Sequence, residues 1–135
     1  MSEPVALFFN ASISPKEFAT TLLSKGGVMD PDSEMEGRVS HGSRHVWFFL
    51  QSPDLRQLEE PIASEVTSAL GGRPQTNLVM EISRHPGSDE LAVELASAFA
   101  AQWPVVAHNL RVPGRIFTPL EIQRRSVEGI GFSAP

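Results

Sequence analysis

The stretch MEGRVSHGSRHVWFFLQ, residues 35–51, decides the fold that the sequence predicts. Met35, Gly37 and Val39 alternate with polar residues, as in a strand with one buried face. The HGS segment that follows is typical of a tight turn, and the second half of the stretch is a nearly continuous apolar and aromatic run. This pattern predicts a β-hairpin, around which the other elements are placed.

Upstream of the hairpin, the sequence predicts a strand followed by a helix. Residues 4–11, PVALFFNA, form a short apolar run that is typical of a strand. Ser14 has the spacing of a helix cap, with Pro15 at the first helical position and Glu17 three residues after the cap. The glycine pair at 26–27 is expected to end this helix.

Downstream of the hairpin, residues 52–72 space their apolar side chains by three or four, as an amphipathic helix does. Pro61 lies inside that pattern. Because proline lacks a backbone donor and clashes with the preceding turn, we expect either a kink or two short helices that meet near Glu60.

The second half of the chain predicts a strand, a helix and a short strand. Residues 76–83 alternate between an apolar and a mixed face. Residues 88–104 have apolar residues four apart, with Ser88 as the expected cap and Pro104 as the expected end, and this helix should be the most buried. Residues 105–108 are expected to form a closing strand.

The order of these elements predicts an α+β fold. Its first six elements run β-α-β-β-α-β, the order of a ferredoxin-like, split β-α-β core, and α-β and a C-terminal arm follow. We therefore expect an antiparallel or mixed sheet with helices mainly on one face, and a different mixed sheet with the same element order is the alternative. Residues 1–110 are expected to form a single domain, with residues 111–135 as an extended arm packed on it.

Composition excludes several classes of function. The 135 residues include no cysteine, which excludes disulfides, thiolate metal sites, cysteine nucleophiles and iron–sulfur clusters. The first residues lack a basic leader, and no apolar run approaches the roughly 18 residues that span a bilayer, so we expect a cytoplasmic protein without a membrane partner.

The charge distribution favours a basic protein partner over nucleic acid. The net charge is −5; residues 1–104 hold 14 of the 16 acidic side chains and 7 of the 11 basic ones. Contacts with phosphates need concentrated lysine and arginine, so we expect no direct binding of nucleic acid. An ordinary acidic surface that keeps the protein in solution explains the charge equally well.

Four carboxylates precede the hairpin, at Asp30, Asp32, Glu34 and Glu36. They do not form an EF-hand, because the positions for the turn glycine and the bidentate glutamate hold Met35 and His41. Four acids in one polar loop also differ from a catalytic carboxylate pair, which needs two different environments within a cleft. The cluster is therefore either a solvated connection or a docking surface for a basic partner.

The remaining candidate residues give weak chemical signals. His41 and His45 lie four apart, and a three-residue GSR loop would place them opposite each other across the hairpin, but two ligands do not make a structural zinc site. No serine sits in a nucleophile elbow, and the glycine pairs lack phosphate-binding spacing. We therefore predict no catalytic residue, no metal site and no cofactor.

Aromatic residues of the hairpin predict a second apolar face. If residues 46, 48 and 50 face the helices, then Trp47 and Phe49 point to the other face beside Glu81, with Phe8 as a further member. A patch of this kind is seldom left open. Either the C-terminal arm covers it, or it is an interface with Trp47 as an anchor. The residues available in the arm are Ile116, Phe117, Leu120 and Ile122.

Residues 76–110, TNLVMEISRHPGSDELAVELASAFAAQWPVVAHNL, resemble a segment of small immunity proteins encoded beside bacterial polymorphic toxins, including those of contact-dependent inhibition systems. The resemblance rests on the pattern of PGS, LA, FA and WP steps. It implies a cytoplasmic, non-catalytic protein that occludes a cognate toxin domain, often a basic nuclease. From the residues, the expected binding surface combines the four loop carboxylates with Trp47, Phe49 and Glu81.

Two other functions remain open from the sequence. One is a small-molecule or metal-binding α+β domain, or an oligomeric enzyme, with His41, His45 and Glu81 near a pocket. The other is a homodimer whose sheet faces pair through Trp47 and Phe49. The sequence does not decide between a monomer and a homodimer.

Overall fold

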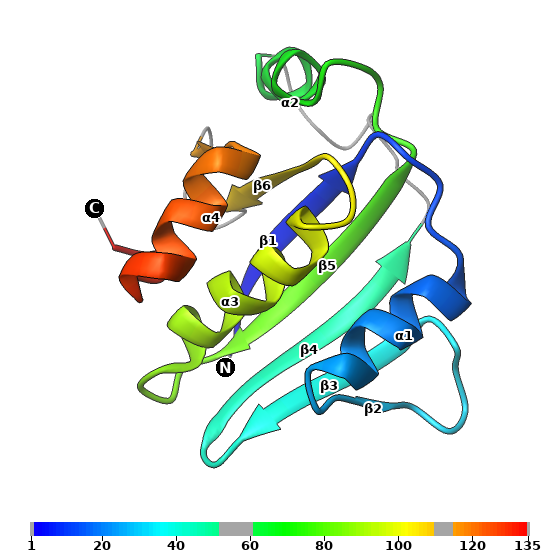
Figure 1. The fold of residues 1–135 in the computed structure, drawn as a ribbon, viewed down its shortest axis with the longest axis vertical. Coiled ribbons are helices and arrows are strands. Elements are labelled where there is room, and N and C mark those ends of the chain that lie inside the picture. Colours follow the sequence, from blue (N-terminus) through cyan, green and yellow to red (C-terminus); the bar gives the residue numbers. More distant parts are fainter. Residues whose placement is uncertain (1, 52–60, 110–114, 135) are drawn as a thin grey trace.

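Seven strands pair into one antiparallel sheet in the order β2-β3-β4-β5-β1-β6-β7 in the computed structural model, which describes residues 2–51, 61–109 and 115–134 (Figure 1). The strands are β1 (Ser2–Phe9), β2 (Val28–Met29), β3 (Glu36–His41), β4 (Arg44–Gln51), β5 (Thr76–Ser83), β6 (Val105–Asn109) and β7 (Ile116–Phe117). The helices are α1 (Pro15–Ser24), α2 (Ile62–Leu70), α3 (Ser88–Ala100) and α4 (Pro119–Glu128). The predicted α+β class with an antiparallel sheet is confirmed.

The start of α1 follows from local chemistry that the sequence made visible. The Ser14 hydroxyl accepts a hydrogen bond from the Glu17 backbone N–H at 3.1 Å, and the Glu17 carboxylate accepts one from the Ser14 N–H at 3.0 Å. This reciprocal pair satisfies two backbone donors that a helix start otherwise leaves without partners. The predicted capping box is thus confirmed.

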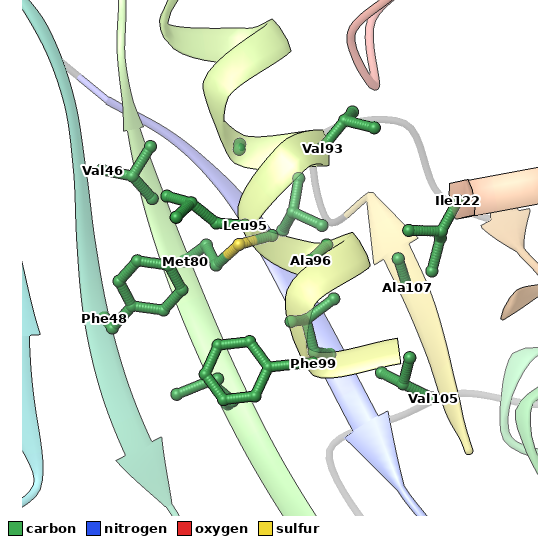
Figure 2. Packing of buried hydrophobic residues seen from close by; sticks show 14 of the residues in the cluster. Val46, Phe48, Met80, Val93, Leu95, Ala96, Phe99, Val105, Ala107 and Ile122 are labelled. Carbon is green, nitrogen blue, oxygen red and sulfur yellow. The ribbon is translucent and has the colours of Figure 1, made fainter. Parts of the chain in front are cut away.

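The principal core lies between the sheet and three helices. Alternate residues of β1, β4 and β5 point to one face, and α1, α3 and α4 lie in front of that face in Figure 1. α3 contributes seven buried residues, the most of the described helices, as its apolar spacing predicts. Figure 2 shows the centre of this core, where β4, β5, β6, α3 and α4 meet through Phe48, Met80, Ala107, Phe99 and Ile122.

The opposite face of the sheet has a smaller apolar cluster under α2. Ala6 and Phe8 of β1 and Val106 of β6 point to this face, and Val66 and Leu70 of α2 pack on them. In Figure 1, α2 stands apart from the other helices at the top of the view. The sheet is therefore covered by helices on one face and only partly covered on the other, within the described residues.

The ferredoxin-like order of the strands within the sheet is not confirmed. That order would place β1 between β4 and β5, whereas β5 lies between β4 and β1. β1 pairs along its full length with β5, from Ser2 opposite Ser83 to Phe9 opposite Thr76. A split β-α-β unit does occur further along the chain, because β5 and β6 flank β1 and are joined through α3.

The C-terminal segment also differs from the predicted extended arm. It contains β7, which pairs with β6, and the ten-residue helix α4, which packs against α3. The Thr118 hydroxyl caps α4 by accepting a hydrogen bond from the Glu121 N–H at 3.2 Å, with Pro119 at the first helical position. This is the same cap-and-proline signal that predicted α1, here masked by the many prolines and glycines around it.

Ser88 is not a helix cap, contrary to the prediction. Gly87 occupies the cap position with a φ of 90°, a left-handed conformation that glycine adopts without strain. The Ser88 hydroxyl instead accepts a hydrogen bond from the His45 backbone N–H at 3.2 Å and so ties α3 to β4. The predicted kink near Glu60 lies outside the described residues; α2 begins directly after Pro61.

Two charged side chains fasten the last residues to the body. The Asp89 carboxylate on α3 accepts hydrogen bonds from the backbone N–H groups of Phe132 at 3.0 Å and Ser133 at 2.9 Å. Arg125, with 2% of its surface exposed, donates to the carbonyls of Gly131 at 2.7 Å and Ala134 at 2.9 Å. These bonds hold the buried Phe132 against Phe117, with ring centroids 5.1 Å apart.

We predict that Arg125→Met lowers the free energy of unfolding by about 3 kcal/mol. The carbonyls of Gly131 and Ala134 lose the guanidinium donor, and the methionine side chain cannot donate a hydrogen bond in its place. The matched control is Arg124→Met, whose side chain is 51% exposed and pairs with Glu121 and Glu128 on the surface of α4. This control should change stability by less than about 0.5 kcal/mol. Urea denaturation of the three proteins measures both effects, and equal effects would contradict the proposed anchoring.

Candidate functional site

A groove of about 310 Å³ lies at the edge of the sheet formed by β2, β3 and β4. The register places Val28 opposite Arg38 and Arg38 opposite Trp47, so these three side chains share the face away from α1. Phe49 is opposite Glu36 on the same face. The groove is lined by Val28, Met29, Asp30, Pro31, Glu36, Gly37, Arg38, Trp47 and Phe49.

The groove combines exposed apolar surface with carboxylates. Val28 is 57% exposed and Trp47 is 37% exposed, and both are large hydrophobic side chains. Asp30 and Glu36 contribute two carboxylates to the lining, and Arg38 contributes one cation. Aromatic and apolar surface bordered by charge is typical of a protein-binding surface.

The acidic loop between β2 and β3 is folded by its own hydrogen bonds. The Asp30 carboxylate accepts from the Asp32 backbone N–H at 2.8 Å, and the Asp30 N–H donates to the Glu36 carbonyl at 3.0 Å. At the end of the loop, the Leu50 N–H of β4 donates to the Met35 carbonyl at 2.8 Å. Residues 30–36, which we call the acidic ridge, therefore form a loop of defined conformation in which Asp32 and Glu34 are exposed.

A second hollow adjoins the acidic ridge. It has a volume of about 550 Å³ and is lined by Pro15, Lys16, Ala19, Met29, Asp30, Pro31, Asp32, Ser33 and Glu34. Met29, Asp30 and Pro31 border both hollows. The carboxylates of the loop are thus divided between two adjacent depressions at one corner of the molecule.

The structure brings together most of the residues predicted from the sequence. Asp30, Glu36, Trp47 and Phe49 line the groove, and Asp32 and Glu34 line the adjacent hollow. Glu81 is opposite Trp47 in the β4–β5 register and extends the same face toward the sheet centre. Sequence reasoning missed Val28, Pro31 and Arg38. The short strand β2 has no alternation that would reveal it, although Arg38 could have been placed from the hairpin register.

The hairpin turn separates the two histidines that a three-residue loop would have paired. His41 is opposite Arg44, so the turn contains only Gly42 and Ser43, and His41 and His45 point to opposite faces of the sheet. The His41 ring nitrogen Nε2 contacts the Lys25 carbonyl at 3.3 Å. No joint metal ligation by these two side chains follows from this geometry.

His45 instead belongs to the face that carries Trp47. Its Nδ1 contacts the Ser40 hydroxyl at 2.7 Å, and its ring stacks near Trp47 with centroids 5.9 Å apart. Among the residues that the structure describes, no three histidine, aspartate or glutamate side chains gather closely enough to hold a metal ion.

The C-terminal segment does not cover Trp47 and Phe49, contrary to one of the two expectations. Phe117 and Ile122 are buried in the principal core on the helix-covered face. Leu120 is 76% exposed on α4, and Ile116 packs under α2 at the far side of the sheet. Residues 115–134 therefore leave the groove uncovered.

Comparisons of the chain with protein-family models, curated proteins and solved structures gave no match. Within the described ranges, no helix is both long enough and apolar enough to cross a membrane.

Gly37 lines the groove, and close packing on the other side of β3 makes it sensitive to substitution. A Cβ there would lie 2.5 Å from Leu22 Cδ2 and 3.0 Å from Met29 Sδ, on the core side of β3. We predict that Gly37→Ala lowers the free energy of unfolding by about 1–3 kcal/mol through overpacking. Gly72→Ala is the control, since its Cβ would have nothing within 4 Å and its φ is not positive.

The control should be neutral or stabilising by up to about 1 kcal/mol, because alanine restricts the unfolded chain. Chemical denaturation measures both variants. An unaffected Gly37→Ala would mean that Leu22 and Met29 move aside without loss.

Proposed function

We propose that this protein binds a basic protein partner through the groove and the acidic ridge, and that it neutralises a toxin domain by occluding it. The observation that carries the proposal is the convergence of exposed Trp47 with the loop carboxylates at one corner of the sheet. Aromatic anchors provide most of the binding energy at protein interfaces, and carboxylates steer the approach of a basic partner.

The charges favour a partner that presents lysine or arginine. Asp32 and Glu34 are exposed on the ridge, and Asp30 and Glu36 lie partly buried beside the apolar wall of the groove. A basic side chain entering the groove would meet these carboxylates and the face of Trp47, a favourable arrangement for a cation. Binding of nucleic acid is not proposed, because the same carboxylates repel phosphates.

The toxin-neutralising role draws its support from the resemblance of residues 76–110 to small immunity proteins. In such a role, the loop carboxylates stand in for the phosphates of the toxin's substrate and block its active site. The proposal includes a cytoplasmic location, where such a toxin would act, and binding without catalysis.

The experiment that tests this function uses the tagged full-length chain as bait in an extract of the cells that produce it. Co-purifying chains are identified by mass spectrometry, and a candidate toxin is then expressed with and without the protein in a sensitive host. A basic partner bound in a fixed ratio, whose toxicity the protein suppresses, supports the proposal. A protein that suppresses no toxicity of any bound partner contradicts it.

For the purified complex, we predict that Asp32→Lys combined with Glu34→Lys slows association at least tenfold at low salt, with a smaller effect at high salt. The matched control reverses Glu90 and Glu94, which are exposed on α3 outside both hollows and change the net charge equally. The control should leave association nearly unchanged. Stopped-flow or surface-based kinetics measures the association rates of both variants. Equal rates for the ridge variant and the α3 control would show that the ridge is not part of the interface.

We also predict that Trp47→Ala weakens the complex by about 2 kcal/mol or more, mainly through faster dissociation, because a buried aromatic anchor is lost. Leu120→Ala is the control, since Leu120 is a more exposed hydrophobic side chain on α4 and lies outside the groove. Isothermal calorimetry of both variants with the identified partner measures the difference. A Trp47→Ala complex of undiminished affinity would place the interface elsewhere.

A further inference from the structure

His108 on β6 is a buried titratable group that the binding site does not use. It is only 3% exposed, and neither ring nitrogen has a hydrogen-bond partner among the described residues. A neutral imidazole carries one donor and one acceptor, so burial leaves both without a partner. Such an arrangement in a native protein requires an explanation.

The ring lies on the sheet face that α2 covers. His108 is flanked in the register by Ala6 of β1 and Ile116 of β7, and both residues belong to the apolar cluster under α2. Val66 and Leu70 are the buried residues of α2 in this cluster. The imidazole is therefore sandwiched between the sheet and a helix by mostly apolar side chains.

The attachment of α2 is unequal at its two ends. At its C-terminal end, the Asn10 side chain donates to the Leu70 carbonyl at 3.2 Å, and Gly71 in the left-handed conformation closes the helix. Just beyond, the Gln75 N–H donates to the Phe9 carbonyl at 2.7 Å. The N-terminal residue Pro61 makes no side-chain capping bond. The helix is thus fastened near Leu70, and Val66 packs on the sheet nearer its middle.

Among the residues that the structure describes, few charged groups face the ring. From α2, Glu65 acts on it; β1 presents Ala6 and Phe8, and β5 presents Val79. On β7, Ile116 is the neighbour, and the Arg115 guanidinium is turned toward the Ala134 carbonyl, which accepts a hydrogen bond from it. Burial lowers the pKa of His108 below 6.5, and the exposed Glu65 only partly opposes this effect.

We propose that α2 is a cover that acid releases from the sheet: a proton on His108 unseats the helix and uncovers the apolar residues beneath it. The imidazolium carries a positive charge and two N–H donors. In the closed arrangement, neither ring nitrogen has a hydrogen-bond partner among the described residues, so burial of the charged ring is unfavourable. Moving α2 away gives both ring N–H groups access to water. Gly71 and Gly72 at the fastened end permit the change of direction that this movement needs.

Release would enlarge the apolar surface of the open face. Phe8 and Val106 lie beneath α2, and the register continues across the sheet from Ala6 through Val79 to Phe49 at the groove. The uncovered surface is therefore contiguous with the groove. This connects an acid-sensitive element at one side of the sheet to the docking surface at the other.

The sign of the pH dependence follows from linkage. In the closed state the pKa of His108 is lower than in the open state, where the ring is solvated and titrates near 6.5. The closed state is therefore fully favoured above about pH 6.5 and loses stability as the pH falls toward the closed-state pKa. Between the closed-state pKa and about pH 6.5, opening takes up one proton. The equilibrium constant for closing therefore falls by up to about tenfold for each pH unit of acidification.

The experiment is amide hydrogen exchange of the full chain between pH 7.5 and 5, corrected for the intrinsic pH dependence of exchange. In the wild-type protein, we expect protection of the amides of residues 66–70 to fall by up to about tenfold per pH unit below pH 6.5, while α3 amides stay constant. His108→Leu should abolish this fall. The control His85→Gln, at an exposed histidine, should retain it.

The Glu65→Gln variant is an independent test, because its expected effect on the acid-induced loss of protection is opposite to that of His108→Leu. Without the carboxylate, the imidazolium is less favourable in the closed state, so the acid-induced loss of protection should be larger than in the wild type. Nuclear magnetic resonance titration of the His108 ring, which needs no variant, should give a pKa below 6.5. Protection of α2 that is independent of pH in the wild type, or a fall that His108→Leu retains, would overturn the proposal.

Discussion

The alternation of side chains along β1, β4 and β5 imposes the constraint on which the rest of the structure depends. Each strand sends alternate apolar residues to the face that α3 covers, and the small residues Ala92 and Ala96 bring that helix close to the sheet. A shift of one residue in any of these registers would turn the apolar set toward water. The positions of the groove, of Trp47 and of His108 on the other face all follow from this choice.

The elements of the fold could be predicted largely from the sequence, because their signals are local. The capping box at Ser14, the hairpin and the period of α3 depend on neighbouring residues. The strand order could not be predicted in the same way. Whether β1 pairs with β4 or β5 depends on contacts between residues far apart in sequence, which no local pattern records. The helix α4 was missed although Thr118 and Pro119 carried its signal.

The candidate site shows the same division between local and long-range information. The carboxylates of residues 30–36 and the aromatic pair in β4 were visible in the sequence, and the hairpin register brings them to one groove. Whether His41 and His45 face each other depends on whether the turn has two or three residues. The sequence did not decide this length, and the structure has two. His108 gave no signal as a buried group, because its burial depends on α2, which packs on β6 from more than thirty positions earlier in the chain.

The sheet ends at both sides in very short strands. β2 and β7 have two residues each, and Pro31, which has no N–H, follows β2 closely. A strand from another molecule would find few main-chain partners there, so the borders are poor templates for polymerisation. The proposed docking at the groove would then depend on exposed side chains rather than on backbone hydrogen bonds shared with the partner. Exposed positions such as Val28, Arg38 and Trp47 can change without disturbing the register or the core, so the scaffold leaves the chemistry of this surface open to variation.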